Sequence, residues 1–392
     1  MTHRDPLSWI EDELEQLDDR GLRRQLAERG GPQAARIVLD GRPLINFGSN
    51  DYLGLASDKR VCRAAANVWQ QGHGGSGASP LVTGRSELHA RLEQRLAEFE
   101  RTEAALLFPT GFAANLGTVA ALVGRGDVVF SDERNHASII DGCRLSRAVV
   151  VVYPHRDASG LRQLLEQARG YRRRLIVTDS LFSMDGDLAP LAELAELAER
   201  HAAMLMVDEA HATGVLGAHG RGVAELLGAE HGVHVRVGTL SKALGTAGGF
   251  VAGRRTLIQW LLNRARGYVF STAAPAALAA ATLASLNVVR DEPQRRATLL
   301  ARAAELRERL RAQAWDLRDS QSQIIPVIVG GADRVMVLAR RLQQSGLLVP
   351  GIRPPTVPPN HALLRISLCW THADEMVASL LDQLASLRAA DE

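Results

Sequence analysis

The middle of the chain, residues 86–208, alternates between short apolar runs and longer segments whose apolar residues recur at helical spacing. The apolar runs contain almost no polar positions, as is typical of parallel strands that are buried on both faces. We expect strands at 104–108, 127–130, 148–153, 175–178 and 202–207. We expect helices at 86–100, 113–122, 161–168 and 191–201. This alternation predicts an α/β fold with a doubly wound, largely parallel sheet between helices.

The flanking segments follow other patterns. The N-terminal part predicts an amphipathic helix at 8–30 and a hairpin whose strands, 37–39 and 44–47, flank an Asp-Gly turn. After a short strand near residue 250, helices continue to about residue 285. The rest is expected to form helices at 295–314, 334–345 and 373–387, and strands at 324–329, 347–349 and 363–368. We therefore divide the chain into an N-terminal segment (1–45), a large α/β domain (46–285) and a smaller α+β domain (286–392).

Composition narrows the class of protein. The chain has 392 residues, of which 46% are apolar, and a net charge of +2, so it can bury a large core and shows no polyanion-binding surface for nucleic acid. Its three cysteines are too few and too dispersed for a disulfide framework or a metal site, which favours a cytoplasmic protein. The N-terminus has no apolar signal region, and the longest apolar stretch, 273–289, is interrupted by polar residues. We expect a buried helix there rather than a membrane span.

One short motif is misleading. Residues 72–77 read Gly-His-Gly-Gly-Ser-Gly and satisfy the G-x-G-x-x-G pattern of dinucleotide-binding folds. That pattern has meaning only between a strand and a helix, whereas here the preceding residues, 61–71, have a helical composition. We therefore do not expect a nicotinamide or flavin dinucleotide site.

Two strand ends carry the residues with the strongest chemical signal. Asp208 ends the buried run 202–207, and Lys242 follows the apolar run that starts at Val235 and ends in Gly-Thr. In open α/β sheets the carboxyl ends of the strands face the ligand crevice. A desolvated lysine amine is a nucleophile toward aldehydes, and an aspartate can hold a pyridine nitrogen protonated, so together they suit pyridoxal phosphate. Taken singly, Lys242 could end a strand at a turn, and Asp208 could cap that turn.

A third strand end could bind the cofactor phosphate. The turn Pro109-Thr110-Gly111-Phe112 leads from a predicted strand into a predicted helix. Backbone N–H groups at a helix N-terminus stabilise a phosphate, although an ordinary strand-to-helix turn has the same pattern.

The chain resembles the α-oxoamine synthases, which belong to the fold-type-I pyridoxal-phosphate enzymes. The similar blocks occur in the family's order and span nearly the whole length: 46–54, 111–115, 135–138, 182–187, 207–211, 238–242 and 353–358. The resemblance implies a seven-stranded sheet in the large domain and a homodimer. Blocks 187–191 and 353–358 are most similar to family members that condense L-alanine with a pimeloyl thioester, with loss of carbon dioxide, in biotin synthesis.

The resemblance also implies roles for individual residues. Lys242 is implied to bind the cofactor aldehyde and then to remove the α-proton, with Asp208 on the pyridinium nitrogen and His136 stacked on the ring. His211 and Ser183 are implied to hydrogen-bond the phenolate oxygen or the thioester carbonyl region. The phosphate is implied to bind to Gly111, Phe112 and Thr239, with Thr272 added from a second subunit. The implied substrate contacts are Arg365 and Asn50 for the amino-acid carboxylate, and Arg23 (or its neighbour Arg24) and Thr356 for the acyl group.

Several alternatives stay open at this point. Within the family, the chain could be a glycine C-acetyltransferase or another enzyme that uses glycine. Outside the family, an aminotransferase of the same fold type would use the same Lys242 and Asp208. A binding protein with a dead site is disfavoured because His136 and Arg365 are present as well. The acyl carrier could be coenzyme A or an acyl carrier protein.

Overall fold

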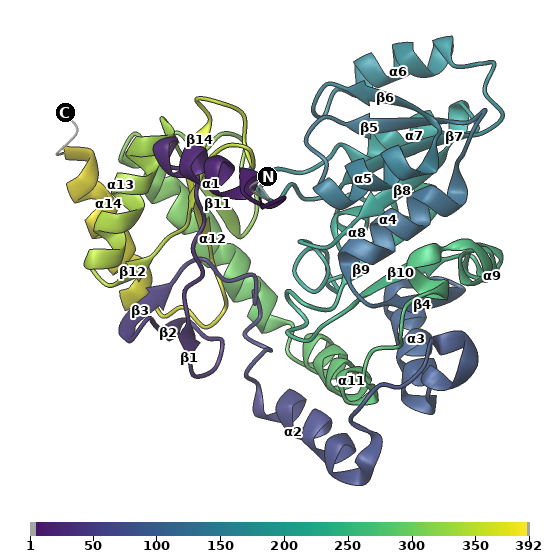
Figure 1. Ribbon diagram of the computed structural model, residues 1–392, viewed down its shortest axis with the longest axis horizontal. Coiled ribbons are helices and arrows are strands. Elements are labelled where there is room, and N and C mark those ends of the chain that lie inside the picture. The colour runs from purple at the N-terminus through teal and green to yellow at the C-terminus, as the bar shows by residue number, and fades with distance from the viewer. Residues whose placement is uncertain (1–4, 390–392) are drawn as a thin grey trace.

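A seven-stranded sheet forms the centre of the computed structural model, which describes residues 5–389 (Figure 1). The strand order is β4-β10-β9-β8-β7-β5-β6, and only β10 is antiparallel to its neighbours. The strands are β4 (Ala104–Phe108), β5 (Val128–Asp132), β6 (Val149–Tyr153), β7 (Arg174–Asp179), β8 (Met204–Asp208), β9 (Val235–Thr239) and β10 (Gly249–Gly253). The predicted doubly wound, mostly parallel sheet is confirmed.

Side chains that alternate along each strand divide the core between the two faces of this sheet. Val128 and Phe130 of β5 belong to one apolar cluster, and Val129 belongs to the other. Buried residues of α3 (Glu87–Glu100), α6 (Ala158–Gln167) and α7 (Leu191–Arg200) cover the first face. Those of α4 (Gly111–Leu122), α5 (Ala137–Ser146) and α9 (Arg255–Arg264) cover the second. The strands are therefore buried on both sides, which explains their continuous apolar runs.

The C-terminal part forms a smaller layered unit. Its three-stranded antiparallel sheet has the order β11-β14-β13 and consists of β11 (Ile324–Gly330), β13 (Gly351–Ile352) and β14 (Ala362–Ser367). Helices α12 (Gln294–Ala312), α13 (Ala332–Gln344) and α14 (Asp374–Ala389) lie around it (Figure 1). The long helix α11 (Ala276–Asp291) precedes them, and the predicted boundary after residue 285 lies inside this helix.

The N-terminal strands pair with the C-terminal part rather than with the central sheet. A four-stranded sheet has the order β1-β2-β3-β12, with β1 (Arg29–Gly30), β2 (Arg36–Leu39), β3 (Arg42–Asn46) and β12 (Leu347–Leu348). The hairpin β2–β3 was predicted, but its parallel pairing with β12 was not. The division into three segments stays a prediction, with the finding that 29–46 share a sheet with 347–348.

The N-terminal helix is shorter than its sequence pattern predicts. We expected a helix over 8–30, but α1 covers only Trp9–Asp19. Gly21 has a positive φ of 62°, which ends the helical path, and no residue of α1 is buried. An amphipathic pattern without a surface to pack against does not extend a helix on its own.

The region of the misleading glycine motif contains no strand. Helix α2 (Lys59–Val68) runs into a π-helical turn at Trp69–His73, and a second such turn follows at Pro80–Gly84. The glycines at 72–77 therefore follow a helix, which agrees with the rejection of a dinucleotide site. Within residues 5–389, every helix is too short or too polar to cross a membrane.

Candidate active site

The carboxyl ends of β7, β8 and β9 meet the N-termini of α4 and α5 around a cavity of about 630 Å³. Eight of the predicted site residues line it, from five different segments of the chain: Gly111, Phe112, His136, Ser183, Asp208, His211, Thr239 and Lys242. The position agrees with the rule that open α/β sheets bind ligands beyond the carboxyl ends of their strands.

Lys242 places its amine inside this cavity. Burial lowers the pKa of the amine from 10.5 to about 8, although the nearby carboxylates of Asp208 and Asp179 raise it. The amine lies 2.8 Å from Nε2 of His211. Burial and the charge of Lys242 hold the pKa of His211 well below its usual value, so this imidazole is neutral. The site therefore contains a lysine with a much larger neutral fraction than a surface lysine has.

Asp208 is held in place at the end of β8. Asn115 of α4 donates to its Oδ2 at 2.6 Å, and the backbone N–H of Ala210 donates to its Oδ1 at 2.8 Å. Asp179, at the end of β7, is fully buried beside it, and burial together with the charge of Asp208 raises the pKa of Asp179 well above its ordinary value. Of the two carboxyl groups, Asp208 is the one with polar donors on both oxygens, and it is the one that can face a cation.

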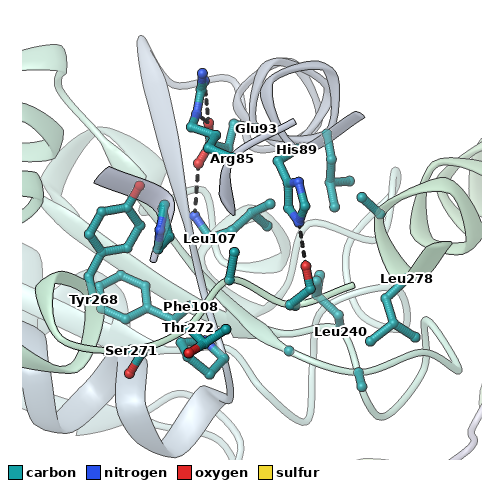
Figure 2. Close-up of a pocket in the computed structure, with 18 residues that line it drawn as sticks. Arg85, His89, Glu93, Leu107, Phe108, Leu240, Tyr268, Ser271, Thr272 and Leu278 are labelled. Carbon is teal, nitrogen blue, oxygen red and sulfur yellow. Dashed lines mark hydrogen bonds and ion pairs between the residues drawn. The ribbon is translucent and has the colours of Figure 1, made fainter. Parts of the chain in front are cut away.

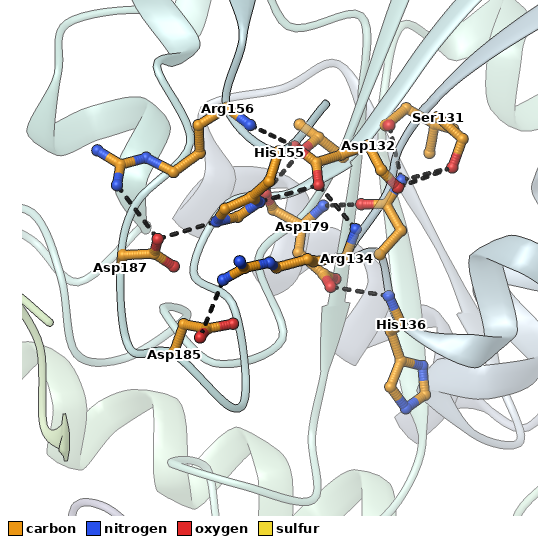
Figure 3. A network of polar contacts seen from close by, with 12 residues as sticks. Ser131, Asp132, Arg134, His136, His155, Arg156, Asp179, Asp185 and Asp187 are labelled. Atoms are coloured by element: carbon orange, nitrogen blue, oxygen red, sulfur yellow. Dashed lines mark hydrogen bonds and ion pairs between the residues drawn. The ribbon is translucent and has the colours of Figure 1, made fainter. Parts of the chain in front are cut away.

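His136 stands at the N-terminus of α5, with its ring at the cavity. Its backbone N–H donates to Oδ2 of Asp179 at 2.9 Å (Figure 3). Its Nδ1 lies 2.7 Å from Oγ of Ser138. The ring of Phe112 meets it edge-on, with centroids 6.2 Å apart. These contacts fix the plane of the imidazole, as a residue that stacks on a planar ligand requires.

The first turn of α4 lies at the cavity with free backbone N–H groups. Thr110 caps the helix by accepting the N–H of Ala113, and the N–H groups of the first turn have no acceptor within the helix. The Thr239 hydroxyl lies 2.8 Å from that of Ser241, at the same end of the cavity. The strand β10 passes so close that a Cβ on Gly249 would lie 2.6 Å from the backbone nitrogen of Gly111. The turn is therefore fixed by backbone packing.

Arg365 enters the site from β14 of the C-terminal part. Its Nε donates to the carbonyl oxygen of Ser183 at 2.6 Å, and its Nη1 donates to Oγ of Ser367 at 2.7 Å and to Oδ1 of Asn50 at 3.2 Å. The side chain is buried beside the cavity. The predicted carboxylate-binding pair, Arg365 and Asn50, is therefore in direct contact.

A buried ionic network holds the loop that carries Ser183 (Figure 3). The imidazole of His155 lies between Asp132 and Asp187, at 3.0 and 2.9 Å. Burial alone would lower the pKa of His155, but the hydrogen bonds that its ring donates to these two carboxylates outweigh burial and raise it to about 9, so it carries a positive charge at neutral pH. Arg156 donates to Asp187 as well, at 3.2 Å.

Three predicted residues lie away from both the cavity and the adjoining pair Arg365–Asn50. Thr272 lines a second pocket, which shares no lining residue with the first (Figure 2). Arg23 is exposed and paired with Asp18 at 2.5 Å, and Thr356 lies in an exposed loop. Arg353 of that loop donates to the backbone oxygen of Arg23 at 3.3 Å, so these two segments are neighbours. The roles of all three stay predictions.

The sequence analysis missed polar residues that complete the site. Tyr52 bridges Asn50 and His211, Asn115 holds Asp208, and Ser241 pairs with Thr239. Tyr52 and Asn115 both lie in blocks on which the family resemblance rests, so their position in those blocks was a usable signal. Ser241 lies in block 238–242, beside Lys242.

Comparisons with known proteins identify the family. The profile of the class I and II aminotransferases matches residues 42–384. An 8-amino-7-oxononanoate synthase from Anaeromyxobacter dehalogenans is 51% identical over 98% of this chain and 96% of its own length. Another, from Geobacter metallireducens, is 48% identical over 96% of this chain and 97% of its own length. The chain belongs to the 8-amino-7-oxononanoate synthase family. The predicted resemblance to the α-oxoamine synthases is confirmed.

A solved structure agrees with this membership. A serine palmitoyltransferase from S. paucimobilis, with bound pyridoxal phosphate and myriocin, superimposes with a TM-score of 0.93. It is 30% identical, and the match covers 99% of each chain. The predicted cofactor of this 8-amino-7-oxononanoate synthase family member, pyridoxal phosphate, is confirmed.

The cavity fits that cofactor. The amine of Lys242 can bind an aldehyde, and Asp208 can pair with a protonated ring nitrogen. The turn Thr110–Phe112 and the hydroxyls of Thr239 and Ser241 provide donors for a phosphate. Gly249 packs so closely against Gly111 of this turn that there is no room for a side chain at position 249.

Proposed function

We propose that this chain condenses L-alanine with a pimeloyl thioester and gives 8-amino-7-oxononanoate, the carrier thiol and carbon dioxide. The observation that carries the proposal is the 48–51% identity to 8-amino-7-oxononanoate synthases over nearly the full length of both chains. The reaction is an early step of biotin synthesis, and it needs an amine nucleophile, a group that can accept a carbanion's electron pair, and a carboxylate-binding residue. The cavity provides the amine and can hold the electron-accepting group, and Arg365 lies beside it.

When bound, the cofactor provides an aldehyde for amines and a protonated ring that takes up the electron pair of the α-carbon. Lys242 would hold the cofactor, and its amine would serve as the base that removes the α-proton of alanine. The lowered pKa of this amine supports the assignment, because a base must be neutral before it can accept a proton. Asp208 keeps the ring nitrogen protonated, and Asn115 fixes the orientation of that carboxylate.

The carboxylate of L-alanine is expected to bind to Arg365. The guanidinium is oriented by Ser183, Ser367 and Asn50, so its position is set before the substrate arrives. His136 is proposed to stack on the cofactor ring, and its contact with Phe112 limits how far the imidazole can turn. Arg23 and Thr356, on neighbouring exposed segments, are proposed to contact the acyl group.

We further propose that the protein works as a homodimer in the cytoplasm. Thr272 lies outside the Lys242 cavity of its own chain, which is the arrangement expected if it contributes to the site of a second copy. Sedimentation velocity of the purified protein tests the dimer. All three cysteines are free, one exposed and two buried, in line with a reducing compartment.

The test of the reaction is free-thiol release by the cofactor-loaded protein, with the product identified by mass spectrometry. Three substrate pairs are compared: L-alanine with pimeloyl-CoA, glycine with acetyl-CoA, and L-serine with palmitoyl-CoA. The last pair is included because of the structural similarity to a serine palmitoyltransferase. Fastest release with the first pair is expected. Faster release with either of the others would reassign the substrate within the family. A fourth reaction, L-alanine with pimeloyl-acyl carrier protein, tests the carrier, and a rate equal to that with pimeloyl-CoA would leave both carriers as substrates.

A further inference from the structure

His155 joins two segments of the large domain through its two ring nitrogens. It follows β6, and its side chain is only 10% exposed. Its Nδ1 lies 3.0 Å from Oδ1 of Asp132, at the end of β5, and its Nε2 lies 2.9 Å from Oδ2 of Asp187, in the loop after β7 (Figure 3). A buried imidazole therefore links the ends of two strands of the sheet to each other.

Both ring nitrogens of His155 carry a hydrogen, because both face an acceptor. The two oxygens of Asp132 accept the backbone N–H groups of Arg134 and Arg156, each at 2.9 Å, and Asp187 accepts the guanidinium of Arg156 at 3.2 Å. A neutral imidazole has one N–H and would place a bare nitrogen against one of these carboxylates. Burial alone would lower the pKa of His155, but its hydrogen bonds to the two carboxylates raise it to about 9. His155 is therefore a cation at neutral pH.

Asp187 ends a tight loop, residues 182–187, which we call the Ser183 loop. Within it the N–H of Gly186 donates to the carbonyl oxygen of Phe182 at 2.9 Å, and the N–H of Phe182 donates to that of Asp187 at 3.1 Å. The ring of Phe182 also meets the ring of His155 edge-on, with centroids 4.4 Å apart. The loop is closed on itself, so a displacement of Asp187 displaces the backbone of the whole loop.

On its other side the Ser183 loop meets the C-terminal part. The carbonyl oxygen of Ser183 accepts Nε of Arg365 at 2.6 Å, and the carbonyl oxygen of Gly186 accepts the hydroxyl of Ser322 at 2.9 Å. The loop thus lies between the charged imidazole and the guanidinium that is proposed to bind the substrate carboxylate. The acceptor that orients Arg365 is a backbone oxygen, so its position depends on what holds the loop.

We infer that His155 is a positioning residue for the amino-acid substrate: as a cation it fixes Asp187, and through the Ser183 loop it orients Arg365 toward the carboxylate of L-alanine. His155 lies outside the blocks on which the family resemblance rests, and it does not line the Lys242 cavity. It acts through the loop and touches neither substrate nor cofactor. The inference rests on the proposed function, in which Arg365 binds that carboxylate.

The experiment compares His155→Gln with His219→Gln in the full-length, cofactor-loaded enzyme. His219 is a matched control, because its ring also contacts a carboxylate, that of Glu225 at 2.6 Å, and does not line the Lys242 cavity. The first readout is the ¹⁵N spectrum of histidine-labelled wild type at neutral pH, with the His155 signals assigned by their loss in His155→Gln. Hydrogen is expected on both ring nitrogens of His155.

The second readout is the binding of L-alanine and of L-alaninol, which has a hydroxymethyl group in place of the carboxylate, followed by the absorbance of the bound cofactor. His155→Gln should raise the apparent Kd for L-alanine about tenfold, the equivalent of one weakened charge-assisted hydrogen bond, and change that for L-alaninol less than about threefold. L-Alaninol is insensitive because it offers Arg365 no carboxylate. His219→Gln should bind both compounds as the wild type does. In thiol release, His155→Gln should raise KM for L-alanine with a smaller change in kcat.

The third readout is the pH dependence of the ratio of the two dissociation constants. As the pH rises through about 9, His155 loses its charge, so the wild type should lose affinity for L-alanine relative to L-alaninol. The ratio removes the titration of Lys242 and of the ligand amines, which affects both compounds alike. In His155→Gln the ratio should stay constant. Aspartate and arginine ordinarily titrate far from pH 9, and the charged groups around His155 are of these two types. They are Asp132, Asp187 and Arg156, and one contact further Arg134, Asp185, Arg318 and Asp319.

The outcomes separate the inference from the proposed function. A single N–H on His155 at neutral pH would overturn the inference. So would equal weakening of L-alanine and L-alaninol in His155→Gln, or no weakening of either, since His155 would then serve only the stability of the fold. If His155→Gln does not fold, the pH dependence of the wild-type ratio still decides. Wild-type protein that binds L-alanine but releases no thiol with pimeloyl-CoA would overturn the proposed function alone, and wild-type protein that does not bind L-alanine would overturn both.

Discussion

The lowered pKa of Lys242 makes the rate of cofactor binding depend on pH in a predictable way. Only the neutral amine attacks an aldehyde, and the pKa of this amine falls from 10.5 to about 8 because the side chain is buried. At pH 7 about one amine in ten is therefore neutral, compared with about one in 3,000 for an ordinary lysine. At pH 7, burial therefore makes the neutral, reactive fraction of Lys242 more than two orders of magnitude larger than that of an exposed lysine.

The assay is cofactor uptake by protein from which the cofactor has been removed, followed by the absorbance of the lysine-bound form. The initial rate is expected to rise about tenfold per pH unit up to about pH 8 and then to level off. A rate that keeps rising to pH 10, as for an exposed lysine, would refute the reasoning from burial.

A charge variant tests the physical cause. Burial lowers the pKa of Lys242, and among the nearby groups that raise this pKa the carboxylate of Asp208 has the largest effect. Asp208→Asn removes that charge at nearly constant volume, so the midpoint of the uptake profile should move below about pH 8. Asp12→Asn, on the exposed helix α1, is the control and should leave the midpoint unchanged. A midpoint that moves upward in Asp208→Asn would contradict the assigned sign.

Three further predictions use the same protein. Arg365→Lys removes the planar guanidinium, which can donate two parallel hydrogen bonds to a carboxylate. It should raise KM for L-alanine about tenfold or more with a smaller change in kcat, measured by thiol release. Gly249→Ala should weaken cofactor binding in equilibrium dialysis, because its Cβ would lie 2.6 Å from the nitrogen of Gly111, whereas Gly170→Ala meets nothing within 4 Å and should bind normally. Glu100 is fully buried, and burial raises its pKa from 4.5 to about 8, so the wild type should lose stability as the pH rises from 4.5 to 8. Thermal unfolding of Glu100→Gln should lack that loss, and parallel curves for the two proteins would contradict it.

The central sheet could be predicted because the signal for each strand lies within the strand's own residues. A parallel strand that is covered on both faces must be apolar at nearly every position, and this pattern is visible in runs such as 202–207. Helix α5 was missed for a local reason as well. It begins at His136, whose ring accepts the capping N–H of Ser138, and histidine is not among the residues that signal a helix start.

Long-range pairings could not be predicted from the pattern. Strand β3 pairs with β12 through residues 45–46 and 347–348. The sequence of neither strand indicates with which other strand it pairs. The end of α1 is a similar case, because the amphipathic pattern continues past Gly21 although the helix does not. Residues of the site were found singly by their chemistry, but Tyr52 needed the structure, since its importance lies in the two side chains that it joins.

The cofactor site and the carboxylate site have different structural origins. Lys242 and Asp208 follow neighbouring strands of one sheet, so their relative position depends only on the large domain. Arg365 comes from β14, and it contacts the large domain through the backbone oxygen of Ser183. Its position therefore depends on how the C-terminal part packs against the loop after β7, which the charged His155 holds in place. Changes at that contact should alter the binding of the amino acid before they alter the binding of the cofactor, because the residues that line the Lys242 cavity include none from the C-terminal part as far as residue 389.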